Sequence, residues 1–224
     1  MYYPSPQPQY RDNQRQANRF LTVTGIGSVK AQPDIANITL GVETQDKELT
    51  TAQQTNAQTL NEVIDALIQI GIPNENIQTV DYFIFPQYDY IDGKQQFRGY
   101  EVTHLITVTI ENLEQTGEVI DTAVANGANR VSNISFTVQD PQSFYQQALA
   151  SALQNANTKA QTIAQTMNLQ IDMTPFSIDE QVPPTQATPQ TFVKAESVGA
   201  TSTPVEPGQL EITARVETKY QYIS

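Results

Sequence analysis

The chain has 224 residues and a formal net charge of −12, and 38% of its residues are apolar. This length can bury a hydrophobic core and predicts one domain or two small ones. The one basic cluster is Arg11, Arg15 and Arg19, so we expect no nucleic-acid partner, because such binders carry a basic stripe. The absence of cysteine excludes disulfides and thiolate chemistry. No run of about 18 apolar residues occurs, which predicts no membrane span.

Residues 1–19 are rich in proline, glutamine, tyrosine and asparagine, a composition typical of a disordered arm. They contain no apolar stretch of the kind found in secretory signals. We therefore expect a cytoplasmic location by default, with the cell envelope or a spore surface as alternatives. The folded domain is predicted to span residues 20–224.

The folded part is predicted to open with two strands and a helix. The first strand begins at Phe20 and ends near a turn at 31–34. Residues 36–42 alternate apolar and polar side chains, which is the period of a half-buried strand. A helix follows over 46–70, and Gly71 and Pro73 end it. Its row at three- and four-residue spacing consists of Leu49, Ala52, Asn56, Leu60, Val63, Ile64 and Leu67.

The middle of the chain predicts two further strands and two further helices. Residues 77–85 and 100–110 form the strands, joined by a loop that contains Asp92-Gly93. The second strand alternates, with Val102, Ile106, Val108 and Ile110 on one face. A short helix at 113–126 precedes a strand at 131–138. Asp140 and Pro141 then provide an N-cap and a first helical residue. That helix runs to about Asn168, and we expect its buried face to consist of Phe144, Ala148, Ala152, Ala156, Ile163 and Met167.

The last part of the chain predicts a strand near 171–181, a mobile Pro/Thr-rich loop at 183–207 and a final strand at 210–217. A short strand at 191–194 is possible within that loop. The final strand is expected to face inward at Leu210, Ile212, Ala214 and Val216. The order ββαββαβαβ(β)β indicates an α+β fold, with an antiparallel or mixed sheet and helices packed on one face.

Short motifs recur along nearly the whole folded part, and their order and spacing are more specific than any one of them. They are Val23-Thr24-Gly25-Ile26-Gly27-Ser28-Val29, Pro33-Asp34-Ile35-Ala36, Gly41-Val42, Gly71-Ile72, Ile77-Gln78-Thr79, Pro86-Gln87-Tyr88, Gly99-Tyr100, Val108-Thr109-Ile110, Gly127-Ala128-Asn129, Ile134-Ser135-Phe136, Ala148-Leu149 with Ala160, and Pro204-Val205-Glu206-Pro207-Gly208. Together they resemble the SIMPL-domain family over residues 21–222. The resemblance implies an α+β protein that assembles into large oligomers, with bacterial relatives that are exported immunogens or linked to oxidative stress. It implies no catalytic residue.

Candidate chemical groups each have a simpler structural interpretation. His104 is the one histidine, and we expect a core or edge residue, because it shares a strand face with Val102 and Ile106. Gly25-Ile26-Gly27 lacks the third glycine and the following helix of a phosphate-binding turn, so close packing is the better interpretation. Carboxylates near the 86–99 hairpin are expected to be solvated turn residues. We therefore predict no enzyme activity, no cofactor and no metal site.

Aromatic residues concentrate in one segment, where 7 of the 18 in the chain fall within 19 residues. Both faces of a hairpin cannot point at one core, so some of these rings must be exposed or face another chain. Aromatic side chains are enriched at the centres of protein interfaces. The predicted interface residues are Tyr82, Phe83, Phe85, Tyr88, Tyr90, Phe97 and Tyr100.

Three functional hypotheses follow. The first is a non-enzymatic structural or protective protein that forms homo-oligomers through sheet edges and the 82–100 hairpin. The second is an adaptor that binds another protein through the 183–207 loop or the 1–19 arm. The third, and least favoured, is a hydrolase that uses the carboxylates Asp89, Asp92 and Glu101.

Overall fold

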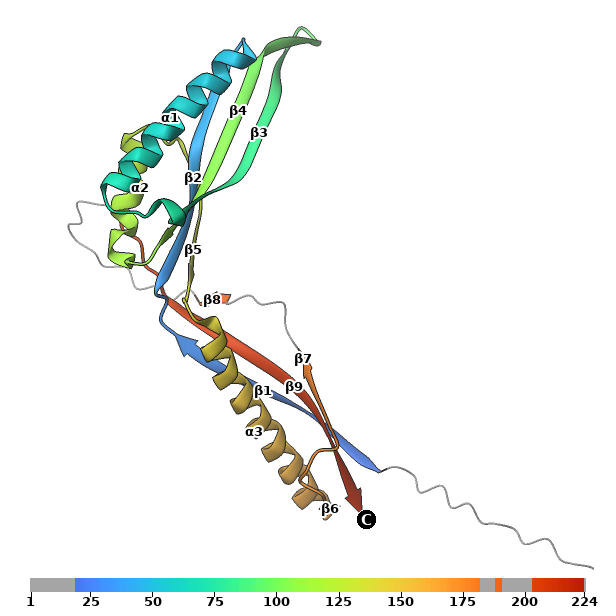
Figure 1. The fold of residues 1–224 in the computed structure, drawn as a ribbon. Helices are drawn as coiled ribbons and strands as arrows, with labels where there is room; N and C mark the ends of the chain where they lie inside the picture. Colours follow the sequence, from blue (N-terminus) through green and yellow to red (C-terminus); the bar gives the residue numbers. More distant parts are fainter. Residues whose placement is uncertain (1–18, 182–187, 191–202, 224) are drawn as a thin grey trace, which may run out of the picture. The chain divides into compact units, whose positions relative to one another are not determined.

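The computed structural model describes residues 19–181, 188–190 and 203–223. Helices occur together with antiparallel sheets, which confirms the predicted α+β class (Figure 1). In chain order the elements are β1 (Phe20–Ala31), β2 (Ile35–Asp46), α1 (Leu49–Gln69), η1 (Asn74–Asn76), β3 (Ile77–Ile91), β4 (Lys94–Ile110), η2 (Leu113–Gln115), α2 (Thr116–Ala125), β5 (Arg130–Thr137), α3 (Pro141–Met167), β6 (Gln170–Ile171), β7 (Ser177–Gln181), β8 (Thr188–Gln190) and β9 (Gln209–Ile223).

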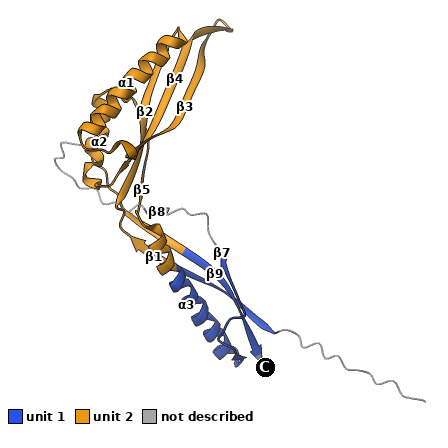
Figure 2. Ribbon diagram, viewed as in Figure 1, with its two compact units in different colours: residues 1–27, 149–183, 214–224 blue, residues 28–148, 184–213 orange. Residues whose placement is uncertain are grey.

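The strands form two antiparallel sheets, where the sequence had suggested one. The four-stranded sheet has the order β3-β4-β2-β5. In the five-stranded sheet β9 lies between β1 and β6, and it also pairs with β7 and β8. The described residues form two compact units, unit 1 within 1–27, 149–183 and 214–224, and unit 2 within 28–148 and 184–213 (Figure 2).

The core of unit 2 lies between the four-stranded sheet and helices α1 and α2, which cover one face of the sheet (Figure 1). The alternation predicted for β2 and β4 is confirmed, because their apolar inward side chains are at most 1% exposed. Helix α1 turns Ala52, Asn56, Leu60, Val63 and Leu67 toward this core. The helices leave the opposite face of the sheet, here called the open face, uncovered.

Turn residues set the ends of α1 and of the β3–β4 hairpin. Gly71 has φ of 97°, and the N–H of Ile72 donates to the Leu67 carbonyl, so the helix stops where predicted. Asp92 and Gly93 have φ of 51° and 73°, which is the two-residue turn that joins long hairpin strands. The strands therefore run up to this turn and are longer than the predicted 77–85 and 100–110.

Helix α3 begins at the predicted N-cap, because the N–H of Ser143 donates to Asp140 Oδ1 at 3.1 Å. The predicted buried face of this helix is wrong at its C-terminal end. Ile163 and Met167 are 37% and 63% exposed, whereas alanines recur at every fourth position of the buried face. These small side chains let the helix approach its sheet closely, which a larger apolar residue would prevent. The buried alanines are Ala148, Ala152, Ala156, Ala160 and Ala164.

The predicted strand at 171–181 is wrong, because two short strands, β6 and β7, replace it. Asp172 closes a turn between them by accepting the N–H of Thr174, and Pro175 has no N–H to donate. The predicted strand at 191–194 and the predicted arm at 1–18 lie outside the described residues. The final strand is confirmed and extends to Ile223, with the predicted inward side chains of β9 at most 8% exposed.

Candidate functional site: the aromatic hairpin

The hairpin of β3 and β4, here called the aromatic hairpin, carries all seven predicted interface residues on its two faces. Tyr82 lies opposite His104 in the register and accepts a hydrogen bond from Gln53 Nε2 of α1 at 3.2 Å, which places Tyr82 on the helix-covered face. Phe83, its neighbour, lies opposite Thr103 and therefore points to the open face. This register puts neighbouring rings on opposite faces of the hairpin, so the rings do not all face one core.

Two groups of rings form on the hairpin. Phe83 and Phe85 stack on the open face, with ring centroids 6.0 Å apart and an interplanar angle of 22°. Phe97 makes edge-to-face contacts with Tyr88 at 5.7 Å and with Tyr100 at 5.1 Å. These contacts do not bury the rings. Tyr100 is half-buried, whereas the exposed members are Tyr82, Phe83, Phe85, Tyr88, Tyr90 and Phe97.

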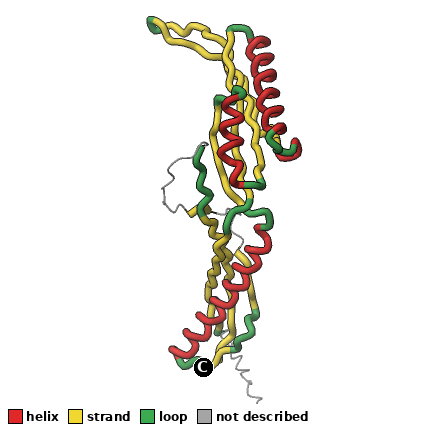
Figure 3. The backbone as a smooth tube through the Cα atoms, turned by 90° about the vertical axis from the view of Figure 1, so that its left-hand side faces the viewer, coloured by secondary structure: helices red, strands yellow, loops and turns green. Residues whose placement is uncertain are grey.

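The hairpin also has an unpaired edge, because β3 is the outermost strand of its sheet. Pro86 lies in the middle of β3, where its missing N–H is tolerated only if that position faces the free edge. The register shifts twice along the strand, between Thr79 and Asp81 and between Gln87 and Tyr88. Such bulges increase local twist, and Figure 3 shows the hairpin tip bending away from α1.

His104 lies at the margin of the helix-covered face and is only half-buried. Its Nε2 is 3.2 Å from Thr79 Oγ1, and its ring meets the Tyr82 ring edge-on at 5.0 Å. Partial burial disfavours the charged imidazole and lowers the pKa of His104. A hydroxyl and a phenol ring are partners of a satisfied structural histidine, as the strand pattern indicated.

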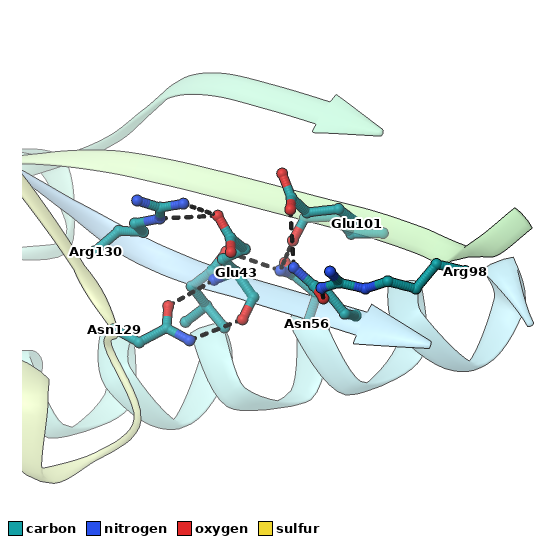
Figure 4. A network of polar contacts seen from close by, with 9 residues as sticks. Glu43, Asn56, Arg98, Glu101, Asn129 and Arg130 are labelled. Atoms are coloured by element: carbon teal, nitrogen blue, oxygen red, sulfur yellow. Dashed lines mark hydrogen bonds and ion pairs between the residues drawn. The ribbon is translucent and has the colours of Figure 1, made fainter. Parts of the chain in front are cut away.

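A polar network on the four-stranded sheet was not predicted from the sequence (Figure 4). The Asn129 side chain accepts from the N–H of Glu43 at 2.7 Å and donates to the Glu43 carbonyl at 2.8 Å, as a neighbouring strand would. Arg130 donates to the Glu43 carboxylate, which raises the pKa of Arg130. The motif Gly127-Ala128-Asn129 was the only sequence signal for this network.

Buried Asn56 fastens α1 to the sheet. Its Nδ2 donates to the carbonyls of Val42 and Val102 at 2.9 Å and 3.0 Å, which ties the helix to β2 and β4 together. Its Oδ1 has no hydrogen-bond partner among the described residues. The helical pattern had placed Asn56 on the buried face, but the pattern alone gave no reason for an amide there.

The carboxylates of the hydrolase hypothesis do not converge on one another. Asp89 lies 3.8 Å from Arg98, and Glu101 accepts a hydrogen bond from Gln45 Nε2 at 2.9 Å. Asp92 occupies the hairpin turn. No group of three metal-ligating side chains occurs within the described part of the chain.

An open recess of about 420 Å³ lies at the base of the hairpin, where β4 approaches the start of α1. Lys47 and Arg98 line it together with Asp46. Arg98 already donates to Gln45 Oε1 at 2.5 Å and lies near Asp89. The recess therefore has no surplus of positive charge that would select an anionic ligand.

Comparison with known proteins confirms the resemblance drawn from the short motifs. The profile of the family described as "SIMPL: Protein of unknown function (DUF541)" matches residues 21–220. "Uncharacterized protein YggE" of Edwardsiella ictaluri is 27% identical over 184 residues, which are 82% of this chain and 77% of that protein. The "26 kDa periplasmic immunogenic protein" of Brucella melitensis is 32% identical over 149 residues, 64% of this chain and 60% of its own.

"Uncharacterized protein YggE" of Escherichia coli K12 is 29% identical over 144 residues, 64% of this chain and 58% of that protein. The chain thus matches about three fifths of the length of the Brucella melitensis and Escherichia coli relatives. The names of these three relatives state no reaction and no substrate.

The expected cytoplasmic location is wrong on this comparison, because the Brucella relatives are named as periplasmic proteins. That expectation rested only on the composition of residues 1–19, and composition does not show where related proteins are located. As for membranes, none of the helices within the described ranges has the length and apolar character that a span requires.

Proposed function

This chain belongs to the SIMPL family, and we propose that it acts without catalysis, as a homo-oligomer that assembles through the aromatic hairpin. The observation that carries the proposal is the exposure of six aromatic side chains on one hairpin. Soluble monomers rarely leave such apolar surface exposed unless it meets a partner. The periplasmic name of the Brucella relatives supports a role in the same compartment, as a structural or protective protein of the cell envelope.

The chemistry of the hairpin favours self-association over binding to a charged partner. Aromatic rings bury much area at little rotamer cost, and charged residues are depleted at interface centres. The exposed hairpin rings are phenylalanine and tyrosine, and the unpaired edge of β3 runs beside them. A second copy would cover the rings, while Pro86 interrupts continuous strand pairing along that edge.

The stacked pair Phe83 and Phe85 offers a measurable share of this association. They are 41% and 53% exposed, and for rings of about 200 Å² this is about 190 Å² of apolar surface per protomer. At about 25 cal/mol/Å² its burial contributes about 5 kcal/mol as an upper bound. Realising half of that, about 2.5 kcal/mol, changes the dissociation constant roughly 60-fold.

The test is the solution mass of the full chain, measured by light scattering after gel filtration at micromolar concentration. We expect wild type to have a multiple of 24.9 kDa and the variant Phe83→Ser/Phe85→Ser to dissociate toward one protomer. The matched control is Ile68→Ser/Val124→Ser, whose side chains on α1 and α2 are 41% and 52% exposed. A monomeric wild type, or a hairpin variant that keeps the wild-type mass, would overturn the proposal.

A further inference from the structure

Strand β1 is an unusually unprotected edge strand by its own sequence. It lies at the outside of the five-stranded sheet, with β9 as its neighbour. Residues 20–29 contain no charged side chain and are rich in β-branched residues. Long, uncharged edges of this kind are templates on which another chain adds a strand. The sequence of β1 therefore predicts strand addition unless another element protects the edge.

Helix α3 supplies that protection. The N–H of Ile26 donates to Asn155 Oδ1 at 3.2 Å. Lys159 Nζ donates to the Thr24 carbonyl at 2.9 Å. In an antiparallel sheet the N–H and C=O of one residue point to the same side, so residues 24 and 26 share one edge. Thr218 Oγ1 approaches the Val23 carbonyl at 3.5 Å from β9, which leaves residues 24 and 26 on the outer side.

The spacing of these two hydrogen bonds fits the geometry of a helix lying along a strand. Residues four apart on a helix are separated by about 6 Å along its axis, and residues two apart on a strand by about 6.8 Å. Gly25 keeps the two elements at this short distance. A Cβ atom there would lie 2.0 Å from the Ala152 carbonyl oxygen and 2.7 Å from Ala156 Cβ. The helix can cap the edge because this residue has no side chain.

The protection does not extend along the whole edge. The next residue of the same helical row is Ile163, which has no polar group and is 37% exposed. It borders a shallow groove of about 440 Å³ that runs from the Lys159 and Thr24 pair to Thr22, near the start of β1. An incoming strand would meet an open edge at Thr22 and would then have to displace Lys159 and Asn155.

We propose that Asn155 and Lys159 form an edge cap that stops a second copy of this chain from adding a strand to β1. The excluded partner is a second copy because two such uncharged edges are complementary to one another about a two-fold axis. The cap restricts self-association to surfaces other than this sheet edge. It acts on β1 and α3 and does not depend on the aromatic hairpin.

The experiment compares full-length variants that keep the net charge. The first is Asn155→Ala/Lys159→Ala/Gln161→Lys, which removes the cap and returns the positive charge at an exposed position away from the edge. The control is Asn157→Ala/Gln161→Ala, which alters exposed residues of the same helix and keeps the cap. Far-UV circular dichroism checks folding, light scattering gives the mass, and thioflavin T reports strand stacking.

We expect the cap-less variant alone to form larger species and to shorten the thioflavin lag time several-fold. Adding Thr22→Lys to that variant should restore the wild-type behaviour, because a lysine on the edge strand blocks strand addition directly. If the cap-less variant behaves like the control, or if Thr22→Lys does not restore it, the inference is refuted. Repeating the series with Phe83→Ser/Phe85→Ser separates this result from association through the hairpin.

Discussion

Asn56 offers the sharpest test of how the helix-covered core is held together. Replacing it by aspartate keeps the size of the side chain but substitutes an oxygen for the nitrogen that donates to Val42 and Val102. Two hydrogen bonds are lost, at about 1 kcal/mol each. A fully buried charge without a partner adds a penalty, and breaking such buried interactions costs about 3–5 kcal/mol. We therefore expect Asn56→Asp to lower the free energy of unfolding by about 4 kcal/mol at neutral pH.

Asn56→Ala should cost less, although it removes more atoms. It also loses two hydrogen bonds, about 2 kcal/mol in total, but it removes the buried Oδ1 that has no partner among the described residues. We expect a net loss of about 1–2 kcal/mol. Burial raises the pKa of the carboxyl group introduced by Asn56→Asp, so that variant should regain stability as the pH falls and the carboxyl group becomes neutral.

Urea denaturation followed by circular dichroism measures the free energy of unfolding of Asn56→Asp and of Asn56→Ala, and its change with pH for Asn56→Asp. The control is Asn61→Asp, an exposed asparagine of the same helix, which should stay within about 0.5 kcal/mol of wild type. If Asn56→Asp is no more destabilising than Asn61→Asp, the two hydrogen bonds to the sheet do not hold α1 in place.

Three further measurements test other parts of the fold. Gly25→Ala places a Cβ against the Ala152 backbone and should cost at least about 1–3 kcal/mol in thermal unfolding. The lowered pKa of His104 means that the unfolded chain binds its proton more readily. The free energy of unfolding should therefore fall as the pH drops below about 6.5, and His104→Gln should flatten the part of that slope that begins there. Asp140→Ala removes the cap on the Ser143 N–H and should cost about 1 kcal/mol in urea denaturation.

The sequence was most informative where one local rule decides the outcome. Alternation in β2, β4 and β9 identified their buried faces, because the side-chain period of a strand leaves no other choice. Asp140 and Gly71 marked helix ends because capping depends on a few adjacent residues. Concentration of aromatic residues in one hairpin was visible for the same reason.

Features that depend on distant residues could not be read in this way. Strand β9 pairs with β1 from the other end of the chain, so the division into two sheets has no local signal. Asn129 and Glu43 are 86 residues apart, and Lys159 and Thr24 are 135 apart. Each of these side chains is of a type that is common on protein surfaces. Only the fold shows which backbone group it meets.

Asn129 has a consequence for how far this sequence can vary. Its side chain pairs with both backbone groups of Glu43 and so completes the β2 ladder without lengthening β5. Among the other amino acids, glutamine alone also carries both a donor and an acceptor in an amide, and it is one methylene too long. In a saturation library this position should tolerate almost no replacement, whereas the exposed residues next to it should accept many.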